Sequence, residues 1–296
     1  MKKIVASVLA LTLAFTMMAC SSETEEAVVA EVAEETVVEE VVAEEVVEEV
    51  AEEVTEERTT LTVGFDASFP PYGYMDDNGQ YIGFDLDLAQ EVADRNGWEL
   101  IKQPIDWDAK DMELSSGTID CIWNGFTING REDSYTWSVP YVDNSQVFVV
   151  AEDSGITGKD DLAGKVVGVQ TGSSALSALE DEDSQENLDL AASFAQLIEY
   201  ADYNTGFMDL EAGAIDVIAM DIGVANYQID SRGGGFVILD ENLATEQYGI
   251  GFLLGNDSLK DTVEATLFEM LEDGTFAEIT EKYADYGLVE SVCLGN

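Results

Sequence analysis

The sequence predicts an α/β fold made of two lobes, each a mainly parallel sheet flanked by helices. The first observation is an internal repeat: residues 112–122 and 208–218 share the pattern Met-acid-Leu-x-x-Gly-x-Ile-Asp-x-Ile. In each copy a helix ends at a glycine and a short apolar strand follows, as in half of a βαβ unit. The second observation is an earlier strand before each copy, Val-Gly-Phe at 63–65 and Val-Gly-Val at 167–169. Because the order strand, helix, strand occurs twice, we expect two lobes of the same topology.

Composition limits the classes of function. The chain has 296 residues, with 62 Asp and Glu against 12 Lys and Arg, no histidine and three cysteines. The missing histidines exclude Ser-His and Cys-His nucleophiles and histidine-ligated metals, and we expect neither a metal nor a cofactor. A net charge of −50 argues against nucleic acids and anionic lipid surfaces as partners. Hydrophobic residues make up 46% of the chain, which is enough for ordinary globular cores.

The N-terminus has the pattern of a secretory signal peptide over residues 1–19. Two lysines precede an apolar run over 4–19 that is too short for a comfortable membrane span. Residues 17–20, Met-Met-Ala-Cys, resemble a bacterial lipobox, which implies that Cys20 is acylated and becomes the mature N-terminus. Plain cleavage near Ala19, which leaves Cys20 free, is the alternative.

Residues 20–57 are predicted to form an acidic, Glu/Val-rich spacer. Between 23 and 57 there are sixteen Glu and no Lys, Arg, Gly or Pro. The Glu pairs recur every four or five residues, as in an amphipathic helix. Like-charge repulsion and the weak helix propensity of Val favour an extended segment instead. The remainder, 58–296, has 46 acidic and 10 basic residues, a net charge of −36, and its length suits two domains.

Each lobe should offer its binding residues at the carboxyl ends of its strands. Ligands of open α/β sheets bind there, where helix N-termini present free N–H groups. The segments that follow Phe65, Ile122, Val169 and Ala219 are therefore candidates for the walls of a cleft between the lobes.

Several segments are similar to one bacterial family. Residues 83–93, Gly-Phe-Asp-Leu-Asp-Leu-Ala-Gln-Glu-Val-Ala, resemble the signature of the extracytoplasmic solute-binding proteins of family 3, which serve ABC importers of polar amino acids. Other similar segments, spread over roughly 58–287, are 66–72, 119–128, 167–173, 272–276 and 282–283. The combination is specific, although each segment alone is common.

The resemblance implies a type II periplasmic-binding-protein fold. Lobe 1 would consist of residues 58–147 and 251–296, and lobe 2 of residues 148–250. Two hinge strands, near 147–150 and 248–251, would let the lobes close on a trapped ligand.

A free amino acid presents a carboxylate and an ammonium group, and neither can be buried without a charged partner. The resemblance implies that Arg131 binds the carboxylate, since a guanidinium can hold both oxygens at once. Arg131 follows Thr127 by four residues, whereas five is usual in the family. A surface arginine paired with Glu132 or Asp133 is the alternative.

Both lobes are expected to add polar contacts to the ligand. They are Asn124, Gly125 and Thr127 in lobe 1 and the turn of Gln170, Thr171, Gly172 and Ser173 in lobe 2. Asp221, at a strand end, is expected to take the ammonium group, or alternatively to cap the helix over 222–230.

Phe69 and Trp107 match positions at which the family stacks aromatic rings on the ligand, and core packing is their alternative role. Asp66 is expected to contact the ammonium group or a basic side chain, or else to cap a turn. Cys121 and Cys293 allow a disulfide, although an inert core thiol is favoured for Cys121.

These predictions describe an extracytoplasmic amino-acid-binding lipoprotein without catalytic residues. It would act as a monomer that captures a free polar L-amino acid, with neutral or basic ligands slightly favoured by charge, and delivers it to an ABC permease and its ATPase subunits. Cys20 would anchor it to the outer face of the cell membrane, on the periplasmic side if the cell has an outer membrane. The alternatives are a dehydratase-type enzyme on the same fold, which needs a further general acid or base, and a stand-alone amino-acid sensor module.

Overall fold

The computed structural model describes residues 58–295. The predicted signal peptide over 1–19, the lipidation site Cys20 and the acidic spacer over 20–57 lie outside these residues. Within 58–295, no helix is both long and apolar enough to cross a membrane.

One ten-stranded sheet runs through the described residues, with a three-stranded sheet beside it. The strands of the large sheet are β1 (Thr60–Phe65), β5 (Glu99–Pro104), β6 (Cys121–Thr127), β7 (Thr136–Trp137), β8 (Val142–Ala151), β9 (Val166–Gln170), β10 (Gln196–Tyr200), β11 (Val217–Asp221), β12 (Phe236–Ile238) and β13 (Ala244–Phe252). The small sheet consists of β2 (Ser68–Phe69), β3 (Gly73–Met75) and β4 (Tyr81–Ile82).

The helices of the described residues cover the faces of the large sheet. They are α1 (Phe84–Asn96), α2 (Lys110–Ser115), α3 (Ser174–Leu179), α4 (Gln185–Ser193), α5 (Tyr203–Glu211), α6 (Ile222–Ser231), α7 (Asp257–Asp273), α8 (Thr275–Glu281) and α9 (Leu288–Ser291). Short 3-10 turns are η1 (Trp107–Ala109), η2 (Lys159–Leu162) and η3 (Ala284–Tyr286).

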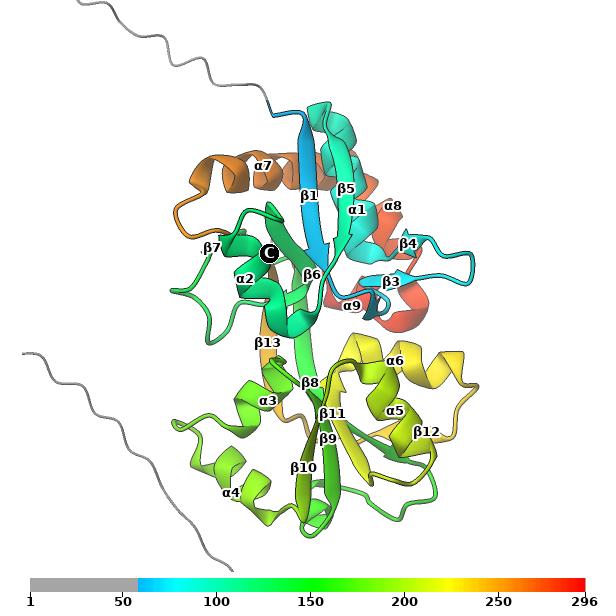
Figure 1. Ribbon diagram of the computed structural model, residues 1–296. Helices are drawn as coiled ribbons and strands as arrows, with labels where there is room; N and C mark the ends of the chain where they lie inside the picture. Colours follow the sequence, from blue (N-terminus) through cyan, green and yellow to red (C-terminus); the bar gives the residue numbers. More distant parts are fainter. Residues whose placement is uncertain (1–57, 296) are drawn as a thin grey trace, which may run out of the picture. The chain divides into compact units, whose positions relative to one another are not determined.

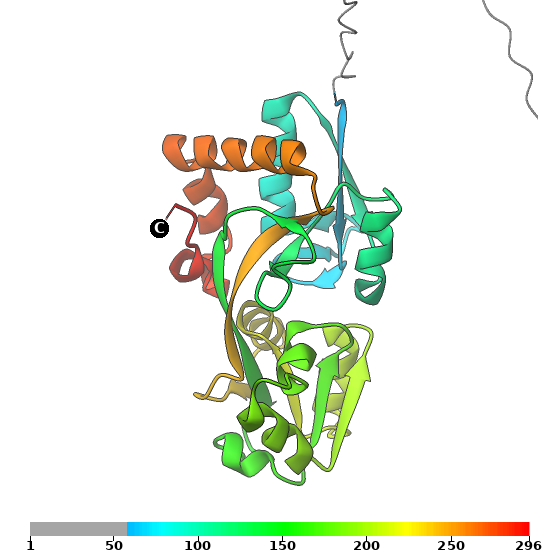
Figure 2. The same ribbon diagram turned by 90° about the vertical axis from the view of Figure 1, so that its left-hand side faces the viewer.

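These elements form two groups, which we call lobe 1 and lobe 2 (Figure 1). Lobe 1 has the parallel strands β5-β1-β6 with α1, α2, α7, α8 and α9, and lobe 2 has the parallel strands β10-β9-β11 with α3, α4, α5 and α6. Figure 2 shows β8 and β13 running side by side from one lobe to the other. This arrangement confirms the predicted α/β fold of two lobes with mainly parallel strands, and the antiparallel strands β8 and β13 join the two sets into one sheet.

The two long strands exchange partners between the lobes. Residues 142–146 of β8 pair with 244–248 of β13, both strands being antiparallel. Beyond this stretch β8 pairs with β11 of lobe 2, and β13 pairs with β6 of lobe 1. We call β8 and β13 the hinge strands. Their mutual pairing lies a few residues before the predicted hinge segments 147–150 and 248–251, and the predicted lobe boundaries stay a proposal.

The internal repeat corresponds to equivalent structure in the two lobes. Helices α2 and α5 are each followed by a glycine in the left-handed region, Gly117 at φ 76° and Gly213 at φ 69°, and then by a buried strand, β6 or β11. The predicted order of helix, glycine and strand is therefore confirmed.

Alternating residues on the strands supply separate cores on the two faces of each sheet. On β11, Val217 and Ala219 pack with α3 in one cluster, whereas Ile218 and Met220 pack with α5 and α6 in another. This period of two is what a strand covered by helices on both faces requires. Cys121, on β6, is fully buried and is a free thiol, as is Cys293. Burial raises the pKa of the Cys121 thiol well above its usual value.

Candidate functional site

The carboxyl ends of β1, β6, β9 and β11 meet where the two lobes face each other (Figure 1). The polar residues at these ends are buried rather than solvated; they are Asp66, Asn124, Thr127, Gln170, Ser173 and Asp221. Burying so many polar groups is costly unless each is hydrogen-bonded. Their hydrogen bonds therefore define what the site can do.

Asp66 joins lobe 1 to lobe 2. Its Oδ2 accepts a 2.8 Å hydrogen bond from Nε2 of Gln170, at the end of β9. Its Oδ1 accepts the Ser68 N–H at 2.8 Å, and its own N–H donates to Oδ1 of Asn124 at 2.8 Å. Burial raises the pKa of Asp66 to about 6. The side chain thus closes a turn, as one alternative expected, and also reaches across the cleft.

Arg131 makes a second connection between the lobes. Its Nη1 donates to the Thr127 carbonyl and to Oγ of Ser174, both at 3.2 Å, and its Nη2 donates to the Gly172 carbonyl at 3.4 Å. Ser174 in turn donates to Oγ1 of Thr127 at 2.7 Å. Among the described residues the guanidinium bonds to neutral oxygens of both lobes rather than to Glu132 or Asp133. Its charge therefore has no anionic hydrogen-bond partner among these contacts.

Asp221 ends β11 and is almost fully buried. Its Oδ1 accepts hydrogen bonds from Asn144 at 2.9 Å, from Gln146 at 2.7 Å and from the Tyr248 hydroxyl. Its Oδ2 accepts only a long bond of 3.4 Å, from the Tyr203 hydroxyl, among the described residues. The side chain makes no capping bond to α6, so the alternative role as a helix cap is not supported. One oxygen is saturated and the other has capacity for a further donor.

The surroundings of Asp221 raise its pKa to about 7, first through burial and then through the nearby charge of Glu246. Both amide groups that bind Asp221 also donate to Oε1 of Glu246, from Asn144 and from Gln146 at 2.7 Å each. Sequence reasoning missed these three residues. The available signal was the run of four polar residues at 143–146, directly before the apolar residues 147–150 of the same strand.

Aromatic side chains from both lobes fill the space between these polar groups. The ring of Phe69 is buried, with its centroid 5.7 Å from that of Tyr72 and 6.0 Å from that of Tyr203 in lobe 2. Gly125 has φ 58°, and a Cβ there would lie 2.9 Å from the Phe69 ring and 3.0 Å from the Tyr248 ring. Only glycine therefore lets the backbone of β6 approach these rings so closely.

Asp85 holds the backbone of Gly125 in place through a hydrogen bond, and the sequence did not predict this role. It lies in the first turn of α1, is fully buried, and accepts the Gly125 N–H at 2.6 Å. Burial raises its pKa to about 7. A carboxylate so placed holds the β6 end in one position without meeting the cleft itself.

The turn after β9 and the residue Trp107 complete the predicted set. Ser173 caps α3, its Oγ accepting the Leu176 N–H at 3.2 Å, and Gly172 has φ 68°. Trp107 is half-buried, lies edge-on to Phe126 at 5.4 Å between centroids, and has Nζ of Lys110 5.2 Å from the centre of its ring.

The mouth of the cleft is a cavity of about 990 Å³ lined by both lobes. Asp66, Trp107 and Thr171 lie in its wall. Its lining contains five carboxylic acids and no Lys or Arg; the acids are Asp66, Asp106, Asp108, Glu113 and Asp202. The predicted residues thus form three connected groups: Asp66 with Gln170 and Asn124, Arg131 with Thr127 and Gly172, and Asp221 with the hinge strands. The first group opens to the cavity through Asp66, and Asp221 is buried beside the hinge strands.

Comparison with known proteins places this architecture in a family. The model of the bacterial extracellular solute-binding proteins, family 3, matches residues 61–286, and the chain belongs to this family. It is 31% identical over 229 residues to the L-cystine-binding protein TcyJ of Escherichia coli, which covers 76% of this chain and 83% of that protein.

Solved structures agree. An ABC uptake transporter substrate-binding protein from Streptococcus pneumoniae with bound histidine has a TM-score of 0.72 and 34% identity, covering 76% of this chain and 92% of that one. An ancestral arginine-binding protein bound to arginine has a TM-score of 0.70 and 34% identity, covering 77% and 99%. These similar proteins are named as binding proteins, for cystine in the first case and with histidine or arginine bound in the other two.

Proposed function

We propose that this protein captures a free polar L-amino acid between its lobes and delivers it to the permease of an ABC importer, without catalysing a reaction. The observation that carries the proposal is the pair of opposite charges on different lobes: the Arg131 guanidinium of lobe 1 and the Asp221 carboxylate of lobe 2. An amino acid needs both, because neither of its charged groups can be buried without a partner.

Arg131 is suited to the ligand carboxylate. Its guanidinium is half-buried and bonds to neutral oxygens, so a carboxylate that replaced these oxygens would gain charge-assisted hydrogen bonds. The hydroxyls of Thr127 and Ser174 lie beside it and can donate to the same carboxylate, as can the Gly172 N–H in the turn after β9. The N–H groups of Thr171 and Ser173 already donate to the carbonyls of Tyr200 and Gln170.

Asp221 is suited to the ligand ammonium. Its Oδ1 is held by three donors, which fixes the carboxylate, and its Oδ2 has capacity for one more. Phe69, Tyr203 and Tyr248 surround this place, and an aromatic wall excludes water and strengthens the charged contact.

The charges that line the mouth of the cleft indicate which ligand side chains the site accepts. Five acids and no described Lys or Arg line it, so an acidic side chain would be repelled, whereas a neutral or cationic one would not. Relatives carry names that include cystine, arginine and histidine. We therefore infer a neutral or basic amino acid.

Delivery requires the protein to stay near its permease. We propose that a lipid on Cys20 anchors it to the outer face of the cell membrane, on the periplasmic side if there is an outer membrane. The acidic spacer over 20–57 would hold the two lobes away from the bilayer, and the protein would meet the permease and its ATPase subunits as a monomer.

Thermal unfolding of the purified protein tests the proposal. The twenty L-amino acids, L-cystine and L-ornithine are added one at a time at micromolar concentration. One or a few should raise the melting temperature, since a ligand at 100 times its Kd adds about 2.7 kcal/mol of stability, and L-Glu and L-Asp should have the smallest effect. No shift with any of them would contradict the proposal.

The same preparation tests the dehydratase alternative. One of the similar structures is an ancestral amino-acid-binding protein described as a precursor of cyclohexadienyl dehydratase, so prephenate and arogenate are the substrates to offer. We expect no turnover; measurable turnover without amino-acid binding would favour the enzyme.

A further inference from the structure

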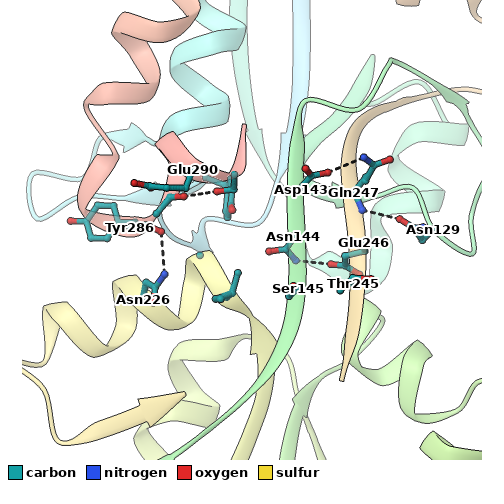
Figure 3. Close-up of a pocket in the computed structure, with 15 residues that line it drawn as sticks. Asn129, Asp143, Asn144, Ser145, Asn226, Thr245, Glu246, Gln247, Tyr286 and Glu290 are labelled. Atoms are coloured by element: carbon teal, nitrogen blue, oxygen red, sulfur yellow. Dashed lines mark hydrogen bonds between the residues drawn. The ribbon is translucent and has the colours of Figure 1, made fainter. Parts of the chain in front are cut away.

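Two buried carboxylates share two amide groups where the hinge strands pair. Asn144 and Gln146, on β8, each direct one N–H to Oδ1 of Asp221 and the other to Oε1 of Glu246, over distances of 2.7 to 2.9 Å. Figure 3 shows the bond between Asn144 and Glu246. Asp221 comes from lobe 2, and Glu246 from β13, so the cluster ties both hinge strands to the proposed ammonium site.

The contacts of this cluster leave its negative charge uncompensated. Glu246 is 7% exposed and Asp221 is 4% exposed, and the hydrogen-bond donors named for them are amides and hydroxyls, all neutral. In this orientation both amides donate to one oxygen of each acid, and an acid that carries a proton on its other oxygen can still accept these bonds. Two unpaired anions this close in a low-dielectric interior are very unfavourable, and such pairs retain one proton.

The proton has few other groups on which to reside. The titratable groups that face Asp221 are Glu246 and Tyr248 on β13, Tyr203 on α5, and Tyr72 in the segment before β3. Burial raises the pKa of all three tyrosines well above 10, so they stay neutral. The exchangeable proton therefore belongs to Asp221, whose pKa is raised by burial and by the nearby charge of Glu246.

We propose that Glu246 is a positioning residue whose charge, held beside Asp221 by Asn144 and Gln146, keeps a proton on Asp221, and that capture of the ligand ammonium by Asp221 expels this proton. The inference rests on the proposed function. In this step the carboxyl O–H bond breaks, the proton passes to solvent, and the ammonium keeps its own hydrogens. The charge of the site is −1 before, from a singly protonated pair, and −1 after, from two carboxylates and one ammonium.

A cavity beside the hinge strands gives the released proton access to solvent. Asn144 and Glu246 line a cavity of about 580 Å³ that also contains Asp143 and Glu290 in its wall (Figure 3). Glu246 thus borders this cavity and is linked to Asp221 through Asn144 and Gln146, which gives the proton a way out that does not pass the bound ligand.

Isothermal titration calorimetry counts the proton. L-Arginine and L-glutamine are titrated into the purified protein between pH 6 and 8, in buffers of low and high ionisation enthalpy, because neither side chain titrates in this range and the α-ammonium group stays protonated. At pH 6.5 we expect more than half a proton released per ligand and at pH 8 close to none, with affinity falling up to about tenfold per pH unit below 7.

The variant Glu246→Gln removes the charge of Glu246 but keeps an oxygen that can accept both amides. Its proton release at pH 6.5 should fall close to zero, and its affinity should change little between pH 6.5 and 8. Asp143→Asn is the matched control, since it removes an exposed carboxylate of β8 that borders the same cavity as Glu246, and it should behave as the unmodified protein does. Circular dichroism establishes that both variants are folded.

Three results would overturn the inference. The unmodified protein could bind ligand at pH 6.5 without releasing a proton, a result that needs no variant. The Glu246→Gln variant could release as many protons as the unmodified protein, or Asp143→Asn could abolish release equally. Absence of binding by both amino acids at every pH would instead count against the proposed substrate class, and with it this inference.

Discussion

Lobe 1 and lobe 2 contain the same helix–glycine–strand unit, given by the repeat at 112–122 and 208–218, but a cation follows the unit in lobe 1 and an anion follows it in lobe 2. In lobe 1, Asp120 follows α2 and accepts the N–H of Thr62 on β1 through Oδ2 at 2.7 Å. In lobe 2, Asp216 follows α5 and accepts the N–H of Val166 on β9 through Oδ2 at 2.8 Å. In both lobes a glycine of the first strand also packs on the first isoleucine of the repeat, Gly64 on Ile119 and Gly168 on Ile215.

The units diverge only where the second strand ends. In lobe 1, β6 continues to Thr127, and the chain then loops to Arg131. In lobe 2, β11 stops at Asp221 and α6 begins at the next residue. The shared unit therefore fixes where the second strand begins, at Cys121 in lobe 1 and Val217 in lobe 2. The residues beyond the unit decide where the strand ends and whether a cation or an anion follows. Function here is added to a common frame.

The largest expected effect comes from removing these two charges. Arg131→Ala and Asp221→Asn should each weaken amino-acid binding by about 2 to 5 kcal/mol, because each leaves a buried ligand charge without its partner. Binding is measured by calorimetry at pH 8 with the amino acid that gives the largest thermal shift. Arg95→Ala is the control, since Arg95 pairs with Glu91 and Asp273 on lobe 1 away from the cleft. Undiminished binding by either test variant would remove that residue from the site.

Packing within the shared unit should give the next largest effect. A Cβ at Gly64 would lie 2.4 Å from Cδ1 of Ile119, and one at Gly168 would lie 2.7 Å from Cδ1 of Ile215 and 2.9 Å from the Tyr200 ring. Gly64→Ala and Gly168→Ala should each lower the free energy of unfolding by about 1 to 3 kcal/mol, as overpacked cores do. Urea unfolding provides the measurement.

A double-mutant cycle checks the cause of that loss. When Ile119→Val accompanies Gly64→Ala, and Ile215→Val accompanies Gly168→Ala, part of the loss should be recovered, because the smaller side chain makes room. Strict additivity in both lobes would mean that the glycines are required for some reason other than this contact.

The sequence predicted what depends on local pattern. The glycine after each helix, the buried strand and the polar residues at strand ends are all written in short segments, so the two-lobed α/β fold followed from them. The placement of Asp66, Thr127 and Gln170 at the facing strand ends followed as well, because parallel strands bring their carboxyl ends to one edge. Their roles toward a ligand stay predictions.

What the sequence did not predict depends on distant pairing. Asn144 and Glu246 are 102 residues apart, and Asp85 and Gly125 are 40 apart. They meet because the hinge strands pair in one register and because α1 packs beneath β6. The role of a buried polar residue cannot be assigned until its hydrogen-bond partner is known. From the sequence alone, Asp85 looks like any acid that favours the first turn of a helix.

The smallest expected effect concerns the aspartate of the shared unit itself. Asp120→Asn and Asp216→Asn exchange a carboxylate for a neutral acceptor at the same backbone N–H, so each should lower the free energy of unfolding by about 0.5 to 1.5 kcal/mol. Asp120 also forms a 2.8 Å ion pair with Arg58, a contact worth about 0.2 to 1 kcal/mol at a partly exposed site. Asp120→Asn should therefore be the more costly of the two.

Salt separates the two contributions at Asp120. Because salt screens exposed charges over a few ångströms at about 1 M, urea unfolding in 1 M NaCl should reduce the excess cost of Asp120→Asn, and Arg58→Ala should remove that excess without touching Asp216. If Asp216→Asn proved neutral while Asp120→Asn stayed costly in high salt, the backbone bond would matter in lobe 1 alone. The repeated aspartate would then mark a common sequence pattern and not a common source of stability.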